Sequence, residues 1–181
     1  MVIAADVTQF WFETHGPADW WSADPAFDRA IAKRFGETHA RLARGEGFAW
    51  RTTPEGRLAE IIVLDQFSRQ LYRQSPRAFA QDGMALVLAQ EAVAAGVDRQ
   101  LAGDRRAFLY MPYMHAESLV VQQAAVPLFA ALGGDEFSKA GAEHLEVLAR
   151  FGRFPKRNAA LGRTSTPAEV TYLAEIGDRM F

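Results

Sequence analysis

A carboxylate lies on the predicted apolar face of RLAEIIVLDQFSR, residues 57–69. Helical spacing puts Leu58, Ile62, Asp65 and Arg69 on one stripe, so Asp65 is expected among core residues. An ionised carboxylate is costly to bury unless it is paired, and Arg69 is the nearest candidate partner. Asp65 is therefore either half of a structural ion pair or a carboxylate presented to a cavity, where it would act as a general acid or base.

The stretch FLYMPYMHAESLVVQQ, residues 108–123, carries an imidazole on a predicted apolar stripe. On a regular helix Glu117 falls about 200° away from His115, so the two side chains are not expected to converge on one small target. His115 is either a hydrogen-bonded core residue or a general base. The H-x-E spacing also occurs in zinc nucleobase deaminases, but a chain without cysteine cannot supply their P-C-x-x-C half.

His144, in AGAEHLEVLARFG, falls at the edge of another predicted packed face, with Ala140 and Leu148. Together with His115 and Asp65 it offers donor types that bind metals. No H-E-x-x-H motif is present, and nothing in the spacing brings the three residues together. Neither a metal nor a cofactor is predicted.

A turn rich in cations follows, and we call residues 150–163 the basic turn. Gly152 is suited to end the preceding helix, and Pro155 prevents its simple continuation. The turn contains no acid, and its cations are Arg150, Arg153, Lys156, Arg157 and Arg163. Such guanidinium groups either pair with internal carboxylates, for which Asp65, Glu117 and Glu143 are candidates, or grip a carboxylate or phosphate ligand.

Three functions are compatible with these residues. The first is a binding module for a small anionic ligand or a peptide carboxylate; its contacts would be Gln66, Arg69, Arg150, Arg153, Arg157, Asn158 and Arg163. The second is an enzyme, for example a hydrolase acting on a small anionic substrate, with acid–base groups among Asp65, His115, Glu117 and His144. The third is a structural or protein-interaction module in which the polar residues form a buried network.

Helices are expected to position all of these side chains. Alanine is abundant, at 32 residues, and alternating runs of β-branched residues are missing. Capping residues precede proline at Asp24–Pro25, Thr53–Pro54 and Thr166–Pro167. The predicted helices span 4–13, 25–44, 54–73, 83–95, 104–133 with a break or start at Pro112, 137–151 and 167–178. No linker divides the chain, so residues 1–181 are expected to form one all-α domain of about seven to nine helices.

The composition excludes several classes of function. The chain has 181 residues and a formal net charge of -2, which argues against general binding to nucleic acid or membrane surfaces. It contains no cysteine, which fits the cytoplasm, and no apolar run long enough for an ordinary membrane span. Aromatic residues near the start of the chain, Trp11, Trp20 and Trp21, are either core residues or part of a homodimer interface.

Several stretches together resemble the mainly bacterial family called domain of unknown function 924. They include TPEGRLAEIIVLDQF, PRAFAQD, FLYMPYMHAES, AEHLEVLARFGRFPKRNAALGR and STPAE, so the resemblance spans essentially the whole chain. It implies an all-α fold of the tetratricopeptide-like type, built from antiparallel helical hairpins, and it implies no particular reaction.

The family signature contains the polar residues singled out above. The matching positions are Asp65, Gln66, Phe67, Arg69, His115, Glu117, His144, Arg150, Phe151, Arg153, Phe154, Pro155, Arg157, Asn158 and Arg163. Ser68 stands where the family usually has proline, and Lys156 stands where it usually has histidine. The match favours one shared polar pocket that includes Asp65, His115, His144 and the basic turn.

Overall fold

The computed structural model describes residues 2–177, in which all regular elements are helical. The all-α prediction is therefore confirmed. In chain order the elements are α1 (Ala4–Gln9), η1 (Phe10–Thr14), α2 (Pro17–Trp20), α3 (Pro25–Leu42), η2 (Phe48–Thr52), α4 (Pro54–Ile62), η3 (Val63–Phe67), α5 (Ser68–Leu71), η4 (Pro76–Ala78), α6 (Asp82–Ala94), η5 (Val97–Gln100), α7 (Gly103–His115), α8 (Leu119–Ala130), α9 (Asp135–Phe151), η6 (Pro155–Arg157) and α10 (Pro167–Ile176).

The helix starts follow the capping signals of the sequence. The Asp24 side chain accepts a hydrogen bond from the backbone of α3, and Thr53 does the same for α4. Thr166 and Glu169 form the predicted capping box of α10. The predicted end of this last helix, residue 178, lies outside the described residues.

The predicted helix over residues 54–73 contains a wider turn than expected. Residues 63–67 form the π-helical segment η3, which carries Asp65 between α4 and α5. Ser68 Oγ donates to the Leu64 carbonyl and Arg69 Nη1 donates to the Asp65 carbonyl, each at 2.5 Å. These side-chain donors compete with backbone N–H groups for the same acceptors, which favours an irregular turn.

The predicted break at Pro112 is wrong, because α7 runs through this residue and ends at His115. Gln122 Nε2 donates to the carbonyls of Met114, at 2.7 Å, and Ala116, at 3.1 Å. The carbonyl of His115 accepts a hydrogen bond from a side chain of the basic turn, described below. Side chains thus satisfy the last carbonyls of α7, and the chain turns into α8 four residues later than Pro112 would suggest.

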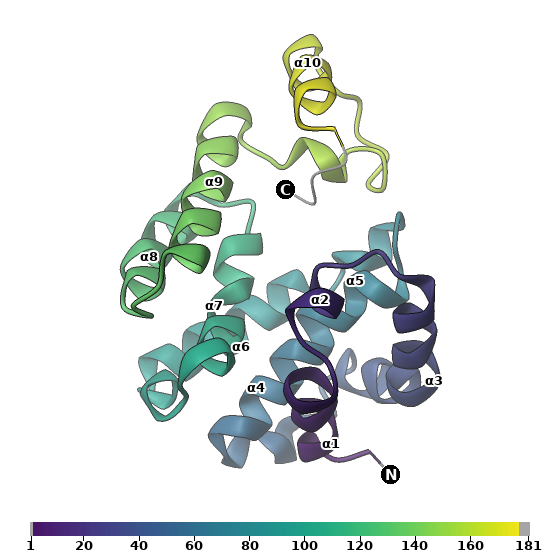
Figure 1. Ribbon diagram of the computed structural model, residues 1–181, viewed down its shortest axis with the longest axis vertical. Coiled ribbons are helices and arrows are strands. Elements are labelled where there is room, and N and C mark those ends of the chain that lie inside the picture. The colour runs from purple at the N-terminus through teal and green to yellow at the C-terminus, as the bar shows by residue number, and fades with distance from the viewer. Residues whose placement is uncertain (1, 178–181) are drawn as a thin grey trace.

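The helix α7 occupies the middle of the molecule (Figure 1). It packs against α4 and α6 on one side and against α8 and α9 on the other, and α8 and α9 form an antiparallel pair. The N-terminal helix α1 packs on α4, while α3 covers η3 and α5.

One hydrophobic cluster joins the helices from α1 to α8, with Trp11 and Phe67 among its fully buried side chains. Trp20 is also buried, whereas Trp21 is 38% exposed. Trp11 and Trp20 are therefore core residues rather than surface groups, and a homodimer stays a prediction.

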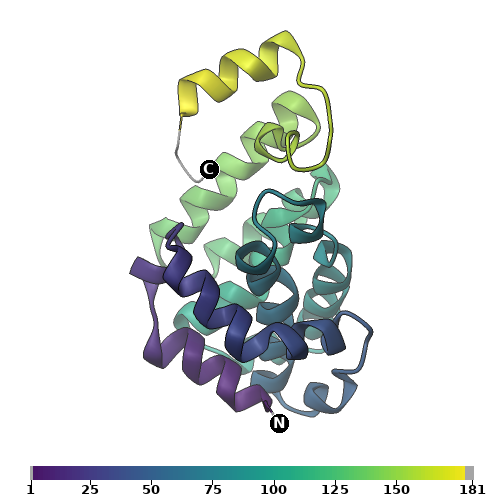
Figure 2. The same cartoon turned by 90° about the vertical axis from the view of Figure 1, so that its right-hand side faces the viewer.

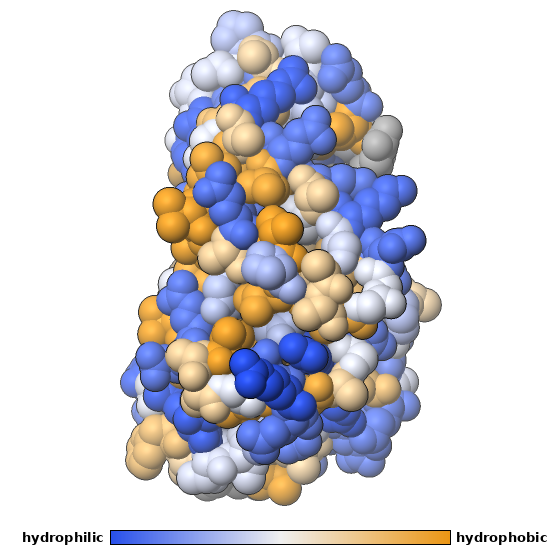
Figure 3. Space-filling view, turned by 90° about the vertical axis from the view of Figure 1, so that its left-hand side faces the viewer, coloured by the Kyte–Doolittle hydropathy of each residue, from blue (hydrophilic) through white to orange (hydrophobic). Residues whose placement is uncertain are grey.

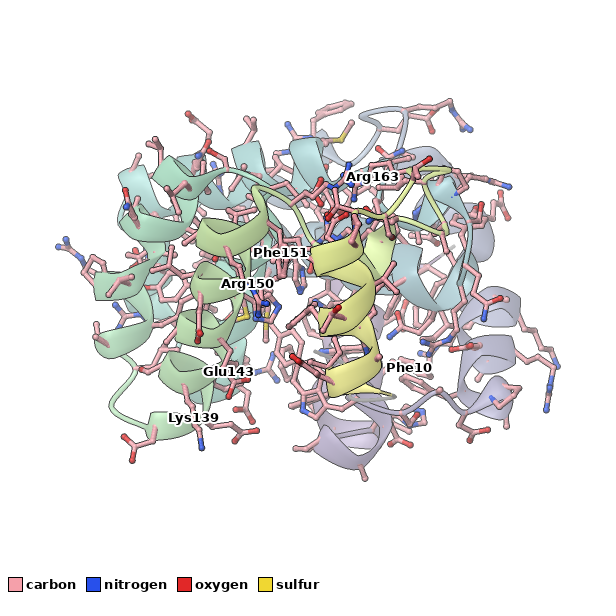
Figure 4. All side chains as sticks on the ribbon, turned by 90° about the horizontal axis from the view of Figure 1, so that it is seen from above. Phe10, Lys139, Glu143, Arg150, Phe151 and Arg163 are labelled. Carbon is pink, nitrogen blue, oxygen red and sulfur yellow. The ribbon has the colours of Figure 1, made fainter. Side chains whose placement is uncertain are left out.

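The last helix lies across the upper end of α9, away from the main cluster (Figure 2). A small second cluster of Val147, Leu148 and Phe154, with Phe151 and Tyr172 packed against it, connects α9, the basic turn and α10. Seen from above, Arg150 and Phe151 lie on the side of α9 that faces α10 (Figure 4). The packing of α10 on α9 and the basic turn therefore places some cations of this turn against α10 and leaves others beside the main part of the molecule.

Apolar side chains also reach the surface on the side that α8 forms (Figure 3). Val120 and Val126 of α8 are 76% and 51% exposed. Within residues 2–177, no helix combines the length and the apolar character that a membrane crossing requires.

Candidate functional site

A cavity of about 380 Å³ lies between the N-terminal helices and the C-terminal third of the chain. One part of its wall is aromatic or thioether in character and is formed by Trp20, Trp21, Phe79, Met111, Met114 and Phe154. Another part is polar and includes Gln66, Arg69, His115, His144 and Arg157. The cavity thus pairs an apolar surface with imidazole and guanidinium groups.

Asp65 and His115 form a buried pair beside the cavity. The Nδ1 atom of His115 lies 2.8 Å and 2.9 Å from the two carboxylate oxygens of Asp65, which is 0% exposed. Burial alone would raise the pKa of Asp65, but the positive charge of Arg69 and the hydrogen bond from His115 hold it well below its usual range. An ionised carboxylate only accepts hydrogen bonds, so His115 Nδ1 carries the proton.

A chain of alternating charges continues from this pair to the basic turn. Arg69 Nη1 is 3.2 Å from Asp65 Oδ1 and 3.1 Å from Asp82 Oδ1. Arg157 Nη1 donates to Asp82 Oδ2 at 3.1 Å, and Arg157 Nη2 donates to the His115 carbonyl at 2.8 Å. The basic turn is thereby fixed to the end of α7 and to the start of α6.

The two histidines of the cavity are held in the neutral form. Burial and the charge of Arg69 lower the pKa of His115, although Asp65 opposes them. Burial and the neighbouring His115 lower the pKa of His144 to about 3. His144 Nδ1 donates to the Ala140 carbonyl at 2.8 Å, and the two rings lie 6.2 Å apart between centroids.

The charged form of Arg157 is disfavoured by burial in this environment. Burial, followed by the charge of Arg69, lowers the pKa of Arg157 to about 10, and Asp82 only partly opposes this shift. The guanidinium carbon lies 4.7 Å from the ring centroids of both Phe79 and Phe154, so the group is held between two aromatic rings. The lowered pKa of Arg157 thus reflects chiefly the loss of water around the guanidinium group, with Arg69 adding to it.

Three other cations of the basic turn lie outside the cavity. Arg153 pairs with Glu169 of α10, and Arg163 pairs with Glu117, with Nη1 2.8 Å from Oε2. Arg150 lies over the rings of Phe151 and Tyr172.

Glu117 and Asn158 also serve local structure. Glu117 Oε1 accepts the backbone N–H of Phe154 at 2.7 Å, and Asn158 Nδ2 donates to Ser165 Oγ at 3.0 Å. As expected, Glu117 does not converge with His115. Of the predicted site residues, the structure gathers Asp65, Gln66, Arg69, His115, His144 and Arg157.

Sequence reasoning missed Asp82, which joins the two buried arginines. It belongs to the PRAFAQD stretch, but no periodicity distinguishes it from a helix-capping acid. Gln70 was missed as well: it lines the cavity, and its Oε1 atom is buried without a hydrogen-bond partner among the described residues. No group of three or more potential metal ligands occurs within residues 2–177.

Comparison with known proteins places the chain in a family. The family model described as "Bacterial protein of unknown function (DUF924)" matches residues 7–177. A solved structure of a protein of unknown function from Agrobacterium tumefaciens is 40% identical, with a TM-score of 0.90, and the alignment covers 95% of this chain and 97% of that chain. No curated protein matches the sequence. The chain belongs to the DUF924 family of bacterial proteins of unknown function.

Proposed function

We propose that this protein binds a small molecule with an apolar body and one anionic group, such as a carboxylate, in the cavity between α2, α7 and α9. The observation that carries the proposal is the position of Arg157 on the cavity wall, next to aromatic and thioether side chains. Its two hydrogen bonds to Asp82 and His115 use two of the five N–H groups of a guanidinium.

The electrostatics of the cavity support an anionic ligand. The lowered pKa values of Arg157 and His144 both reflect burial together with neighbouring positive charge. A ligand carboxylate would relieve this potential and would raise the pKa of both groups.

The size and lining of the cavity support a small molecule as the ligand. A volume of about 380 Å³ lies within the range of small-molecule sites. Apolar walls with a few polar groups are typical of such sites. We further propose that the helices form a tetratricopeptide-like arrangement of hairpins and that the protein acts in the cytoplasm. The cysteine-free composition supports the cytoplasmic location.

The proposal is tested by comparing 3-phenylpropionate with its neutral analogue 3-phenylpropionamide. Tryptophan fluorescence is a suitable readout, because Trp20 and Trp21 line the cavity. The acid is expected to bind at least about tenfold more tightly than the amide. Equal affinity for the two compounds, or no binding of either, would contradict the proposal.

A matched pair of arginine variants locates the site. Arg157→Gln is expected to abolish the preference for the acid. Arg163→Gln removes a cation from the same turn, but Arg163 lies outside the cavity and pairs with Glu117, so this variant should keep the preference. A loss of the preference only in Arg163→Gln would place the ligand elsewhere on the basic turn.

A further inference from the structure

The Asp65–His115 pair leaves one ring nitrogen of His115 available for chemistry. Because the Asp65 carboxylate accepts the Nδ1 proton, the Nε2 atom of the neutral imidazole carries a lone pair. The side chain of His115 is 14% exposed and lines the cavity. A buried carboxylate that fixes the tautomer and orientation of a histidine is the arrangement used for general-base catalysis.

Among the residues that the structure describes, the cavity presents no hydroxyl or thiol side chain to this base. Its lining residues, all within the described part of the chain, include no serine, threonine, cysteine or tyrosine. With no hydroxyl or thiol side chain to deprotonate, this base would activate a water molecule or a hydroxyl group of the ligand. The cavity has room for water next to a small ligand, since a water molecule occupies about 30 Å³ of liquid volume.

We propose that the protein hydrolyses a small carboxylic ester with an apolar acyl group, using His115 as the general base that activates water. Asp65 is the positioning residue for His115. This inference rests on the proposed function, because the carboxylate product belongs to the anion class that the cavity is proposed to bind.

The reaction balances with water as the only co-reactant. A water oxygen attacks the ester carbonyl carbon and forms a new C–O bond, while one water proton moves to His115 Nε2. The carbonyl oxygen becomes an oxyanion, which the positive potential around Arg157 stabilises. When the tetrahedral intermediate collapses, the bond to the alcohol oxygen breaks, and the His115 imidazolium returns its proton to that oxygen. The products are the carboxylic acid, which ionises at neutral pH, and the free alcohol.

The pH dependence of turnover is set by the groups around His115. The charged or titratable groups nearest to it are Asp65 of η3, Arg69 of α5, Asp82 of α6, His144 of α9 and Arg157 of η6. The same cavity is also lined by Arg73, Glu136 and Lys156. The pKa of His115 is lowered from its ordinary value by burial and by Arg69, so the base form predominates at neutral pH. The rate is therefore expected to stay constant above neutral pH and to fall on the acid side.

The test uses His115→Asn with two 4-nitrophenyl esters, the butyrate and the 3-phenylpropionate. Asparagine retains an N–H group near the position of Nδ1 that can still donate to Asp65, but it lacks the Nε2 base. His15→Asn is a matched control, because His15 Nδ1 forms a similar 2.9 Å contact with Asp19 and does not line the cavity. His115→Asn is expected to lower kcat/KM at least about 100-fold, whereas His15→Asn should leave it unchanged.

Binding of 3-phenylpropionate to the same variants separates the two proposals. His115→Asn should still bind the acid within about threefold of the parent, and it should lose turnover. A parent that binds the acid but hydrolyses neither ester would overturn the hydrolase inference and leave the proposed function standing. Turnover that survives in His115→Asn would also overturn it, as would a burst of one equivalent of 4-nitrophenol, which would indicate a covalent acyl intermediate. Turnover that depends on His115 in a protein without affinity for the acid would overturn the proposed function instead.

Discussion

Arg153 and Glu169 form a two-pronged ion pair that joins the basic turn to α10. Arg153 Nε lies 2.7 Å from Glu169 Oε1, and Arg153 Nη2 lies 2.8 Å from Oε2. The same carboxylate accepts the Thr166 backbone N–H at 2.7 Å as part of the capping box. Arg153, which was predicted from the sequence as a ligand contact, therefore holds the last helix in place.

Arg153→Gln is predicted to loosen α10 without affecting the cavity. Other contacts of α10 include the packing of Tyr172 against Phe151 and Arg150 and a 3.4 Å hydrogen bond from Asn158 Nδ2 to Glu169. Hydrogen exchange of residues 167–176 should become at least about tenfold faster, while the affinity for 3-phenylpropionate should stay within about twofold. Arg99→Gln, at an exposed position of η5, is the control. Unchanged exchange in Arg153→Gln would show that packing alone holds the helix.

Stability is predicted to fall as the pH decreases below 6.5, because His144 resists protonation in the folded state. Its folded pKa of about 3 lies below the ordinary value of 6.5, so the unfolded chain takes up the proton first. The contribution of His144 is complete above pH 6.5 and is lost at ~1.4 kcal/mol per pH unit below it. In His144→Asn, which retains a donor for the Ala140 carbonyl, the loss between pH 7 and 5 should be smaller by about 2 kcal/mol. Urea denaturation at both pH values measures this difference, and equal losses in the two proteins would contradict it.

Asp65→Asn is predicted to destabilise the fold by about 1.5–3 kcal/mol, because His115 loses its charged acceptor and Arg69 keeps only Asp82 as a carboxylate partner. The exposed pair between Glu13 and Arg105 supplies a control: Glu13→Gln should cost less than about 1 kcal/mol. Urea denaturation at pH 7 compares the two variants. Equal costs for Asp65→Asn and Glu13→Gln would contradict this prediction.

Gly56→Ala is predicted to cost at least about 2 kcal/mol, because the new Cβ atom would lie 1.9 Å from the carbonyl oxygen of Trp50. That neighbour is backbone and cannot rotate away. Gly36→Ala in α3 meets no atom within 4 Å and should be neutral or stabilising by up to about 1 kcal/mol. Thermal unfolding of the two variants is a direct comparison, and similar melting temperatures would rule out the close approach at Gly56.

Local signals in the sequence predicted most helices, because capping residues and proline act within one turn. The Asp24, Thr53 and Thr166 caps all lie where they were expected. The end of α7 was not predictable in this way, since distant side chains complete it. Arg157, for example, donates to a carbonyl 42 residues earlier in the chain.

The distinction between local contacts and contacts distant in sequence also explains which features of the candidate site could be predicted. Asp65, His115 and His144 were recognisable because each polar residue interrupts an apolar stripe of its own helix. In the basic turn, the prediction of internal pairing with Glu117 is confirmed by Arg163. The other pairings were not predictable, because the sequence does not state which acid meets which arginine. Glu169 and Asp82 take Arg153 and Arg157, and neither acid was considered as a partner. Competition among nearby acids for a few cations is decided by tertiary packing, which periodicity does not describe.

The contact between Arg157 and Asp82, which spans 75 residues, has a consequence for the protein during its synthesis. The buried residues of the main hydrophobic cluster end at Phe129, and Phe137 and Ala140 pack against it, so a chain that has emerged from the ribosome as far as residue 150 already contains that core. It still lacks Phe154 and Arg157 and therefore one wall of the cavity. A ligand of this cavity would stabilise only chains that have emerged beyond η6, and it would protect completed molecules from proteolysis more than unfinished ones.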